Sequence, residues 1–555
     1  MSTQNIRFIL LGLLFGVLFL LFNYWETEKL NNNLKNDNEN FLLNDLKSDN
    51  DFLDVNQNND KIFIYDNQLK KNDIIKYDNN YDYIFVKTDV YNIKIDLYGG
   101  DITFLELLKY PISKFKNSSG FVLFDTSDLR YYIAQCGLLS ENGPDSKRLG
   151  KVKFFCDQEN FFIGDNDFLF VDLFYQTDNK INFTKRFCFK KNNYLIDVEY
   201  IVSNNSNNNY YGYMYGRLKQ SEKISNDSIL MMSARSYTGG AVYTPSKHYK
   251  KVLFSDIESN KLFNEQIFGG WISMVEHYFL SAWIPSPNNE YIYCSERYGD
   301  KIYGVRFICK NPLIVEPGCI NSIKASLFAG PEIVDVLKNI SDGLSLTVDY
   351  GILWPIAQPI FWVLKNINNF FKNWGFSIII TTLLIKLLFY KLSASSYKSM
   401  AKMRKLQPRI NLLKESCGDD KTKFGKAIMD LYKQENVNPL GGCLPIIIQI
   451  PVFISLYYVL LESVELRQAE FIFWIVDLSS SDPYYILPII MGISMLIQQK
   501  LSPAPLDPIQ AKMMLIMPLI FCFLCFQFPS GLVLYWVVNN LLSILQQLFI
   551  VKRYS

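Results

Sequence analysis

Long apolar runs separated by short polar stretches dominate the last third of the chain. A run of about 20 apolar residues is long enough for a helix to cross a bilayer. The pattern predicts five membrane spans, at residues 374–392, 443–463, 484–499, 513–528 and 531–550, the last four forming a block over 443–551. Two of these runs are short and contain Pro488 and Pro518, so their ends are the least defined.

Another apolar run extends from Phe8 to Phe22, near the N-terminus. Bulky aromatic residues follow it instead of small ones, which favours a retained signal anchor over 1–25, with its N-terminus in the cytoplasm. A cleaved signal sequence is the alternative, because the run is short. Residues 26–60 are mostly Asn, Asp, Lys and Glu and predict a disordered linker. With the anchor, the predicted number of spans is six.

Apolar and polar residues alternate with a period of two in the segment 61–345. Examples are the apolar positions 91, 93, 95 and 97, before the turn at Gly99-Gly100, and the positions 196, 198, 200 and 202. Short strands with frequent turns predict an all-β sandwich domain. The two histidines of the chain, His248 and His277, lie here outside any ligand motif, so we expect them to be structural.

The period changes to that of a helix over residues 350–372. Apolar residues such as Leu353, Ile360 and Leu364 mark one face, and polar residues such as Lys365 and Asn369 mark the other. This pattern is typical of an amphipathic helix that lies in the membrane interface. An ordinary helix packed on the sandwich is the alternative.

The loop after the first of the five spans is strongly basic. Residues 391–440 contain eleven basic and five acidic residues, a net charge of +6. By the positive-inside rule this loop is cytoplasmic, which puts the β domain on the outer side. Apolar residues recur every three or four positions on both sides of Gly418, so we expect a helical hairpin over 393–440.

The hairpin carries a row of cations that suits an anionic partner, either anionic lipid or ribosomal RNA. A solvated face without a partner is the alternative. The residues expected to recruit the partner are Lys398, Lys402, Arg404, Lys405 and Arg409.

Composition and motifs argue against an enzyme. The chain has no P-loop, no H-E-x-x-H motif and no G-x-S-x-G nucleophile elbow. The ten cysteines have no metal-ligand spacing, and Cys522 and Cys525 lie within an apolar run, where packing is expected. We therefore expect no catalytic residue, no metal site and no cofactor. Whether the cysteines of the β domain form disulfides stays open.

Lys386 is the one cation well inside an apolar run, at 374–392. A cation at membrane depth costs about 2.5–3.5 kcal/mol on insertion scales, so it needs water, a partner or the interface. It either snorkels to the headgroups, as Lys391 five residues later suggests, or lines a polar cavity between helices. Thr381, Thr382, Gln449 and Asn539 are polar residues of the same spans that suit a cavity, or else hydrogen-bond between helices as packing contacts.

Several longer stretches resemble the YidC family of membrane protein insertases, which is related to the mitochondrial oxidase-assembly and chloroplast insertases. The stretches occur in the family's order and spacing. They are NWGFSIII (373–380), SMAKMR (399–404), LQP (406–408), VNPLGGCLP (437–445), SVELRQA (463–469), DPYYILP (482–488) and FPSGLVLY (528–535), with GGD (99–101) and SENGPD (140–145) in the β domain.

The resemblance implies a polytopic α-helical protein of the bacterial inner membrane, with six spans and a five-helix insertase core. It also implies a periplasmic β-supersandwich, an interfacial helix and a cytoplasmic helical hairpin. The core would enclose a hydrophilic groove that is open to the cytoplasm and lipid. In the family the charge in this groove is an arginine, and here Lys386 occupies the matching position. The resemblance adds Thr382 and Tyr535 as groove residues.

The activity implied is that of an insertase and chaperone, which receives nascent membrane proteins and releases their spans into the bilayer. The partners implied are the Sec translocon with its accessory subunits, and the ribosome with its targeting machinery. A small-molecule carrier with a sugar-binding outer domain is the alternative. Against it, the sequence has no inverted repeats and no paired broken helices.

Overall fold

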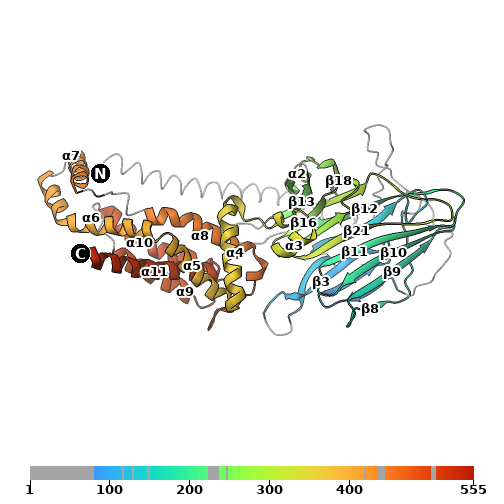
Figure 1. The fold of residues 1–555 in the computed structure, drawn as a ribbon, viewed down its shortest axis with the longest axis horizontal. Coiled ribbons are helices and arrows are strands. Elements are labelled where there is room, and N and C mark those ends of the chain that lie inside the picture. Colours follow the sequence, from blue (N-terminus) through green and yellow to red (C-terminus); the bar gives the residue numbers. More distant parts are fainter. Residues whose placement is uncertain are drawn as a thin grey trace, which may run out of the picture.

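The computed structural model describes residues 81–554, except 115–117, 128–129, 147–149, 223–236, 246–247, 300, 418–420, 436, 438–443 and 502–507. The predicted anchor over 1–25 and linker over 26–60 lie outside the described residues. The described chain forms a β domain followed by a group of helices (Figure 1).

Two sheets make up the β domain. In the described residues, one sheet has 13 strands, with β15-β18-β19-β12-β5-β4-β3-β2-β1-β8 as its main order. The other has eight, in the order β14-β13-β16-β17-β21-β11-β10-β9. The strands of the larger sheet are β1 (Tyr83–Lys87), β2 (Tyr91–Asp96), β3 (Asp101–Pro111), β4 (Gly120–Ser127), β5 (Arg130–Leu139), β6 (Asp145–Ser146), β7 (Gly150–Lys151), β8 (Asn160–Phe162), β12 (Tyr210–Ser221), β15 (Asn264–Phe268), β18 (Glu290–Arg297), β19 (Ile302–Cys309) and β20 (Leu313–Val315). Those of the smaller sheet are β9 (Phe168–Gln176), β10 (Ile181–Lys190), β11 (Leu195–Asn204), β13 (Thr238–Thr244), β14 (His248–Val252), β16 (Trp271–Glu276), β17 (Phe279–Pro285) and β21 (Ile320–Pro331).

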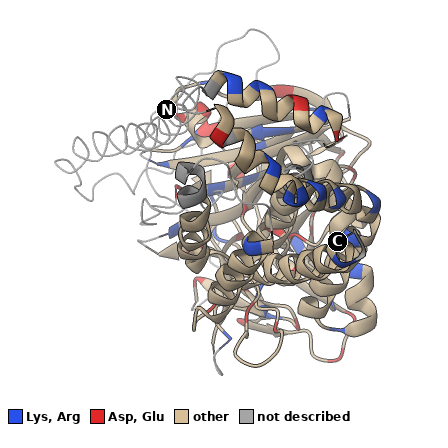
Figure 2. Ribbon diagram, turned by 90° about the vertical axis from the view of Figure 1, so that its left-hand side faces the viewer, with Lys and Arg blue, Asp and Glu red and all other residues tan. Residues whose placement is uncertain are grey.

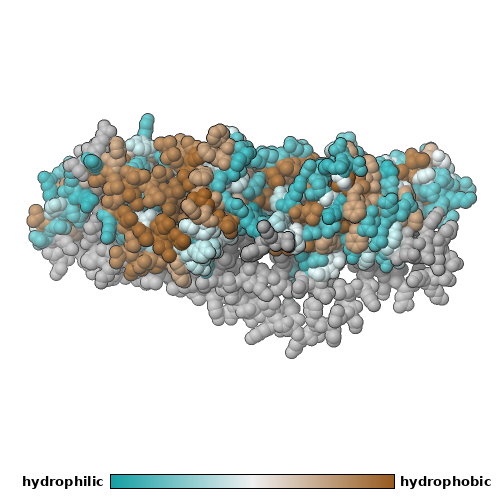
Figure 3. All heavy atoms as spheres, turned by 90° about the horizontal axis from the view of Figure 1, so that it is seen from below, coloured by the Kyte–Doolittle hydropathy of each residue, from teal (hydrophilic) through white to brown (hydrophobic). Residues whose placement is uncertain are grey.

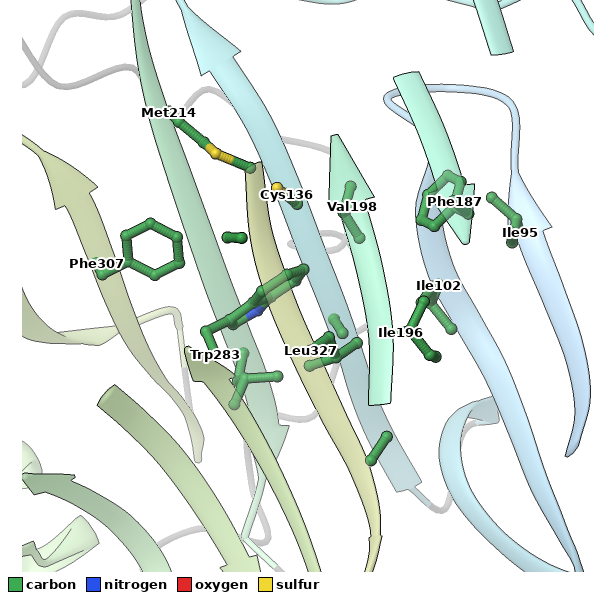
Figure 4. Packing of buried hydrophobic residues seen from close by; sticks show 14 of the residues in the cluster. Ile95, Ile102, Cys136, Phe187, Ile196, Val198, Met214, Trp283, Phe307 and Leu327 are labelled. Carbon is green, nitrogen blue, oxygen red and sulfur yellow. The ribbon is translucent and has the colours of Figure 1, made fainter. Parts of the chain in front are cut away.

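The sheets pack face to face because each strand turns its apolar positions inward. Along β2 and β11 buried and less buried residues alternate, as a period of two requires. Side chains of both sheets meet in one core, where Ile102 and Cys136 of the larger sheet lie near Val198, Trp283 and Leu327 of the smaller (Figure 4).

A buried cation explains the Gly-Gly-Asp stretch of the β domain. Lys185 of β10 is fully buried, and its amine donates hydrogen bonds to the carbonyls of Gly99 (2.9 Å), Gly100 (2.7 Å) and Cys136 (2.6 Å). Gly100 has a φ of +66°, and a Cβ there would lie 3.0 Å from the Lys185 side chain. Burial lowers the pKa of Lys185, and the neighbouring carboxylate of Asp101 opposes that shift. The role of the Gly-Gly-Asp stretch is therefore structural, because it binds the buried amine of Lys185.

The structural role expected for the two histidines fits their surroundings. His277 Nε2 lies 2.9 Å from the carbonyl oxygen of Leu461, and its ring stacks on Tyr278 at 3.8 Å. The His248 ring lies 6.3 Å from that of Tyr243. All nine cysteines within the described residues are free thiols.

One short helix, α2 (Phe254–Glu258), lies inside the β domain, and the other helices follow that domain. They are α3 (Val334–Ile340), α4 (Trp354–Phe371), α5 (Trp374–Leu388), α6 (Tyr390–Cys417), α7 (Lys421–Gln434), α8 (Leu444–Glu462), α9 (Ile486–Leu501), α10 (Pro508–Leu524) and α11 (Ser530–Tyr554). Short 3-10 turns lie at Leu344–Thr347, Gly351–Leu353, Val464–Leu466 and Cys525–Gln527.

The helix α4 is amphipathic. Its buried face, which includes Ile360 and Leu364, packs against α5 and α8. Trp362 and Phe370 of the other face are 68% and 82% exposed, far more than large apolar side chains usually are in water. The helix ends where Lys372 adopts a left-handed conformation, with a φ of +52°.

The apolar run 374–392 is divided between two helices. The helix α5 ends at Leu388, and α6 begins at Tyr390 at an angle of 68° to it. In the described residues, Ser530–Lys552 of α11 is long and apolar enough to span a membrane by itself, and the bent pair α5–α6 is a second candidate. Three shorter apolar helices overlap three of the predicted spans and cover Ile448–Glu462, Ile486–Leu501 and Met514–Gln527. The number of six spans stays a prediction.

The helical part presents a hydrophobic surface. Figure 3 shows hydrophobic residues gathered over the helical part on the face turned to the viewer, while the β domain is more mixed. The exposed residues on α5 include Leu383, Leu384, Leu387 and Leu388, and those on α10 include Leu515, Leu519 and Phe523. Such a continuous apolar surface is expected of helices that face lipid.

Candidate functional site

Lys386 lies in the last turn of α5, and its side chain is half-buried. Its amine donates a hydrogen bond to the hydroxyl of Ser543 on α11, 2.7 Å away. The Ser543 hydroxyl in turn donates to the carbonyl of Asn539, one turn earlier on α11, also over 2.7 Å. The cation is therefore held by another helix of the bundle.

A third helix joins this network through the side chain of Asn539. Gln449 of α8 donates a hydrogen bond from its Nε2 to Asn539 Oδ1. Three of the residues predicted for the groove, Lys386, Gln449 and Asn539, are thus linked across α5, α8 and α11. The link passes through Ser543, which is 2% exposed.

The other three predicted groove residues are buried. The Thr382 hydroxyl donates to the carbonyl of Ile378 in its own helix, 2.6 Å away. The Thr381 hydroxyl, which is also buried, makes no hydrogen bond with the described residues. Tyr535 is 2% exposed, and its ring lies 6.4 Å from that of Phe453 on α8. The structure does not link these three residues to Lys386 by a hydrogen bond between side chains in the described chain.

Reasoning from the sequence missed Ser543. The available signal was the spacing of Asn539 and Ser543, which lie four residues apart and therefore on one face of a helix. Polar residues continue along α11, where Asn540 donates to Ser494 of α9 (2.9 Å).

The basic segment forms two packed helices, α6 and α7. Leu406 and Ile410 of α6 pack against Ile428 of α7 in a small apolar cluster. The cations on which the prediction rests, Lys398, Lys402, Arg404, Lys405 and Arg409, are all exposed. Arg409 pairs with Glu435 at 2.7 Å. Figure 2 looks onto this end of the molecule and shows the Lys and Arg positions along the helices there.

Two protein families together match almost all of the chain that the structure describes. Residues 83–363 match the YidC periplasmic domain, and residues 366–555 match the 60Kd inner membrane protein family. The membrane protein insertase YidC of Pseudomonas putida (strain F1) is 48% identical over 476 residues, which cover 85% of this chain and 84% of the relative. That of Pseudomonas savastanoi pv. phaseolicola (strain 1448A) is 47% identical over 473 residues, with the same coverage.

The chain belongs to the YidC family of membrane protein insertases. The resemblance noted in the sequence is thereby confirmed. So are the activity of a membrane protein insertase, the location in the inner membrane and the periplasmic β domain with a helical insertase core. This family is not enzymatic. The alternative, a small-molecule carrier, is set aside because both relatives are named insertases.

A crystal structure of an active YidC insertase with its first transmembrane domain resolved is also similar. It covers 84% of this chain and 92% of its own, with 19% identity and a TM-score of 0.39. No group of three or more His, Cys, Asp and Glu residues in the described parts of the chain is placed to hold a metal ion.

Proposed function

We propose that in this YidC insertase the linked residues Lys386, Ser543, Asn539 and Gln449 receive the polar flank of a nascent membrane span. The observation that carries the proposal is that hydrogen bonds from Lys386 on α5, through Ser543, and from Gln449 on α8 both end on Asn539 of α11, within apolar helices. Polar groups buried in hydrocarbon without partners cost several kcal/mol each, roughly. A connected set of donors and acceptors lowers that cost for an entering polar segment.

Lys386 supplies the positive charge of this site. An acidic flank of the client would pair with the amine, while water solvates its remaining polar groups. The family's arginine offers a planar fork of donors, and a lysine offers one compact charge on a flexible stem. We therefore expect Lys386 to attract a carboxylate without the two-point contact that arginine makes.

The release of the client needs no nucleotide. Burial of about 20 apolar residues in lipid drives the transfer, at about 25 cal/mol per Å² of apolar surface. The exposed leucines of α5, among them Leu387 and Leu388, support contact between an entering span and lipid beside the cation. Thr381, Thr382 and Tyr535 belong to the proposed groove wall.

The arrangement across the membrane is part of the proposal. We infer six spans with the α6–α7 hairpin in the cytoplasm, where its exposed cations meet the ribosome and targeting machinery or anionic lipid. The net charge of +6 over 391–440 supports this orientation. We also propose the Sec translocon and its accessory subunits as partners, on the strength of the family likeness.

The test is insertion of a small two-span client into vesicles that contain the full chain. Native protein is compared with Lys386→Ala, Lys386→Arg and Lys386→Glu, and Lys391→Ala serves as the matched control because Lys391 is exposed just after the bend. We expect Arg to preserve insertion, Ala and Glu to abolish it, and the control to match native protein. Equal insertion by all variants would mean that Lys386 only snorkels to the headgroups.

A further inference from the structure

The hydroxyl of Ser543 makes two hydrogen bonds within the described residues, one as donor and one as acceptor. It donates to the Asn539 carbonyl of its own helix and accepts from the Lys386 amine on α5, each over 2.7 Å. A serine hydroxyl has one proton and two acceptor sites. Because its proton goes to the carbonyl, its lone pairs are left to accept from Lys386.

Lys386 lies just before the bend at Phe389, where α6 leaves α5 at 68°. Its amine reaches across to Ser543 on α11, which is 2% exposed. The helix α11 packs against both α5 and α6. The direction of the Lys386 side chain is therefore set by a buried hydroxyl of a neighbouring helix.

We propose that Ser543 is a positioning residue, which holds the Lys386 amine toward the polar network on α11. This inference rests on the proposed function of Lys386. An ammonium group has three donors, so the bond to Ser543 orients the amine and leaves donors for a client carboxylate.

A lysine needs such a restraint more than an arginine does. Its four-carbon stem is flexible, and near lipid it can turn its amine toward the headgroups. Since the planar fork of arginine is already organised for binding, less order is lost with each bond that it forms. Ser543 supplies the order that the lysine lacks.

The experiment compares two clients that differ only in the flank of their first span, one with Asp and one with Asn. The full-length variants Ser543→Ala and Ser543→Thr are reconstituted in vesicles beside native protein and Lys386→Ala. The matched control is Ser455→Ala on α8, since the buried Ser455 hydroxyl makes no hydrogen bond with the described residues. The measured quantity is the initial rate of insertion of each client.

We expect Ser543→Ala to slow the Asp client about tenfold and to leave the Asn client near the native rate, because a bond to a charged group is lost. Ser543→Thr retains the hydroxyl and should keep the rate of the Asp client near that of native protein. The selectivity for the acidic client is what a merely structural role would not produce.

Two results would overturn the inference while the function of Lys386 stands. One is a loss for the Asp client with Lys386→Ala but not with Ser543→Ala. The other is an equal loss for both clients with Ser543→Ala, which would indicate a packing defect. If Lys386→Ala itself has no effect on either client, the proposed role of the cation fails, and the role of Ser543 fails with it.

Discussion

Arg467, between α8 and α9, donates a hydrogen bond from Nη2 to the main-chain carbonyl of Pro111 at the end of β3, 2.8 Å away. Gln468 Nε2 donates to the same carbonyl over 2.9 Å. The segment that carries these two residues also contacts the start of α5, where Asn373 donates to the Phe471 carbonyl (3.1 Å). The segment between α8 and α9 thus contacts both the β domain and the insertase core through hydrogen bonds.

We expect the double variant Arg467→Ala, Gln468→Ala to loosen this contact. The Arg467 bond, made by a charged donor to a carbonyl, is worth about 1.5–3 kcal/mol. Protease cleavage of the full chain within residues 108–120 should become faster in the variant. The control Lys109→Ala removes an exposed pair with Asp89 inside the β domain (3.6 Å) and should change cleavage less. Unchanged cleavage in the double variant would contradict the role of this contact.

Glu332, just after β21, makes stability depend on pH. It is 2% exposed, and one of its carboxylate oxygens makes no hydrogen bond with the described residues. Burial, and then the nearby Glu462 carboxylate, raise the pKa of Glu332 well above its usual value, while the nearby Thr347 opposes the shift. The folded protein therefore keeps a proton that the unfolded chain loses above about pH 4.5. The contribution of Glu332 to the free energy of unfolding therefore falls as the pH rises from about 4.5 toward the pKa of Glu332 in the folded protein.

Glu332→Gln should remove this dependence and raise the melting temperature at pH 7–8 relative to the native chain, with a smaller difference at pH 5. The full chain in detergent is heated at several pH values between these limits. The exposed Glu316→Gln is the control and should leave the curve unchanged. Parallel curves for native protein and Glu332→Gln would show that Glu332 does not set the pH dependence.

Gly375, in the first turn of α5, lies against the ring of Phe471. A Cβ at this position would come within 1.9 Å of Phe471 Cδ2, too close for any side chain without a shift. Gly375→Ala should therefore destabilise the protein by about 1–3 kcal/mol, as overpacking does. Thermal unfolding of the full chain measures the loss.

The double variant Gly375→Ala, Phe471→Ala provides the matched control, since it removes the ring that the methyl group would meet. It should be more stable than the sum of the two single changes indicates, because the residues contact each other. Additive losses would mean that the close approach at Gly375 is not what limits substitution there.

The exposed cations of α6 should govern binding to an anionic partner. Replacing Lys402, Arg404 and Lys405 by Gln should weaken co-sedimentation of the full chain with ribosomes and make the remaining binding less sensitive to salt. The same variant should bind vesicles with anionic lipid more weakly, by about 1 kcal/mol for each cation near the surface.

Three exposed lysines of the periplasmic domain, Lys87, Lys261 and Lys324, give the control for total charge. Their replacement by Gln changes the net charge equally and should leave ribosome binding intact. Equal weakening by both triple variants would indicate a general effect of charge and not a site on α6.

Local periodicity determined the elements that the sequence could predict. The alternation at 91–97 predicts a strand, and β2 covers Tyr91–Asp96. The helical repeat at 350–372 predicts a helix, and α4 covers Trp354–Phe371. Such patterns can be read without a structure because a strand or helix places its own side chains with a fixed period. The motifs, in their order, also identified the family.

The connections between elements were decided only by the tertiary structure. Ser543 lies in an apolar run and gives the same sequence pattern whether or not it bonds to another helix, so its contact with Lys386 depends on how α5 and α11 meet. The break at Phe389 lies within one continuous apolar run. The buried Lys185 amine is satisfied by three carbonyls, two from the turn at Gly99-Gly100 and one from Cys136 of β5. A hydrogen bond between distant segments needs both partners in place, and periodicity along one segment carries no information about the other.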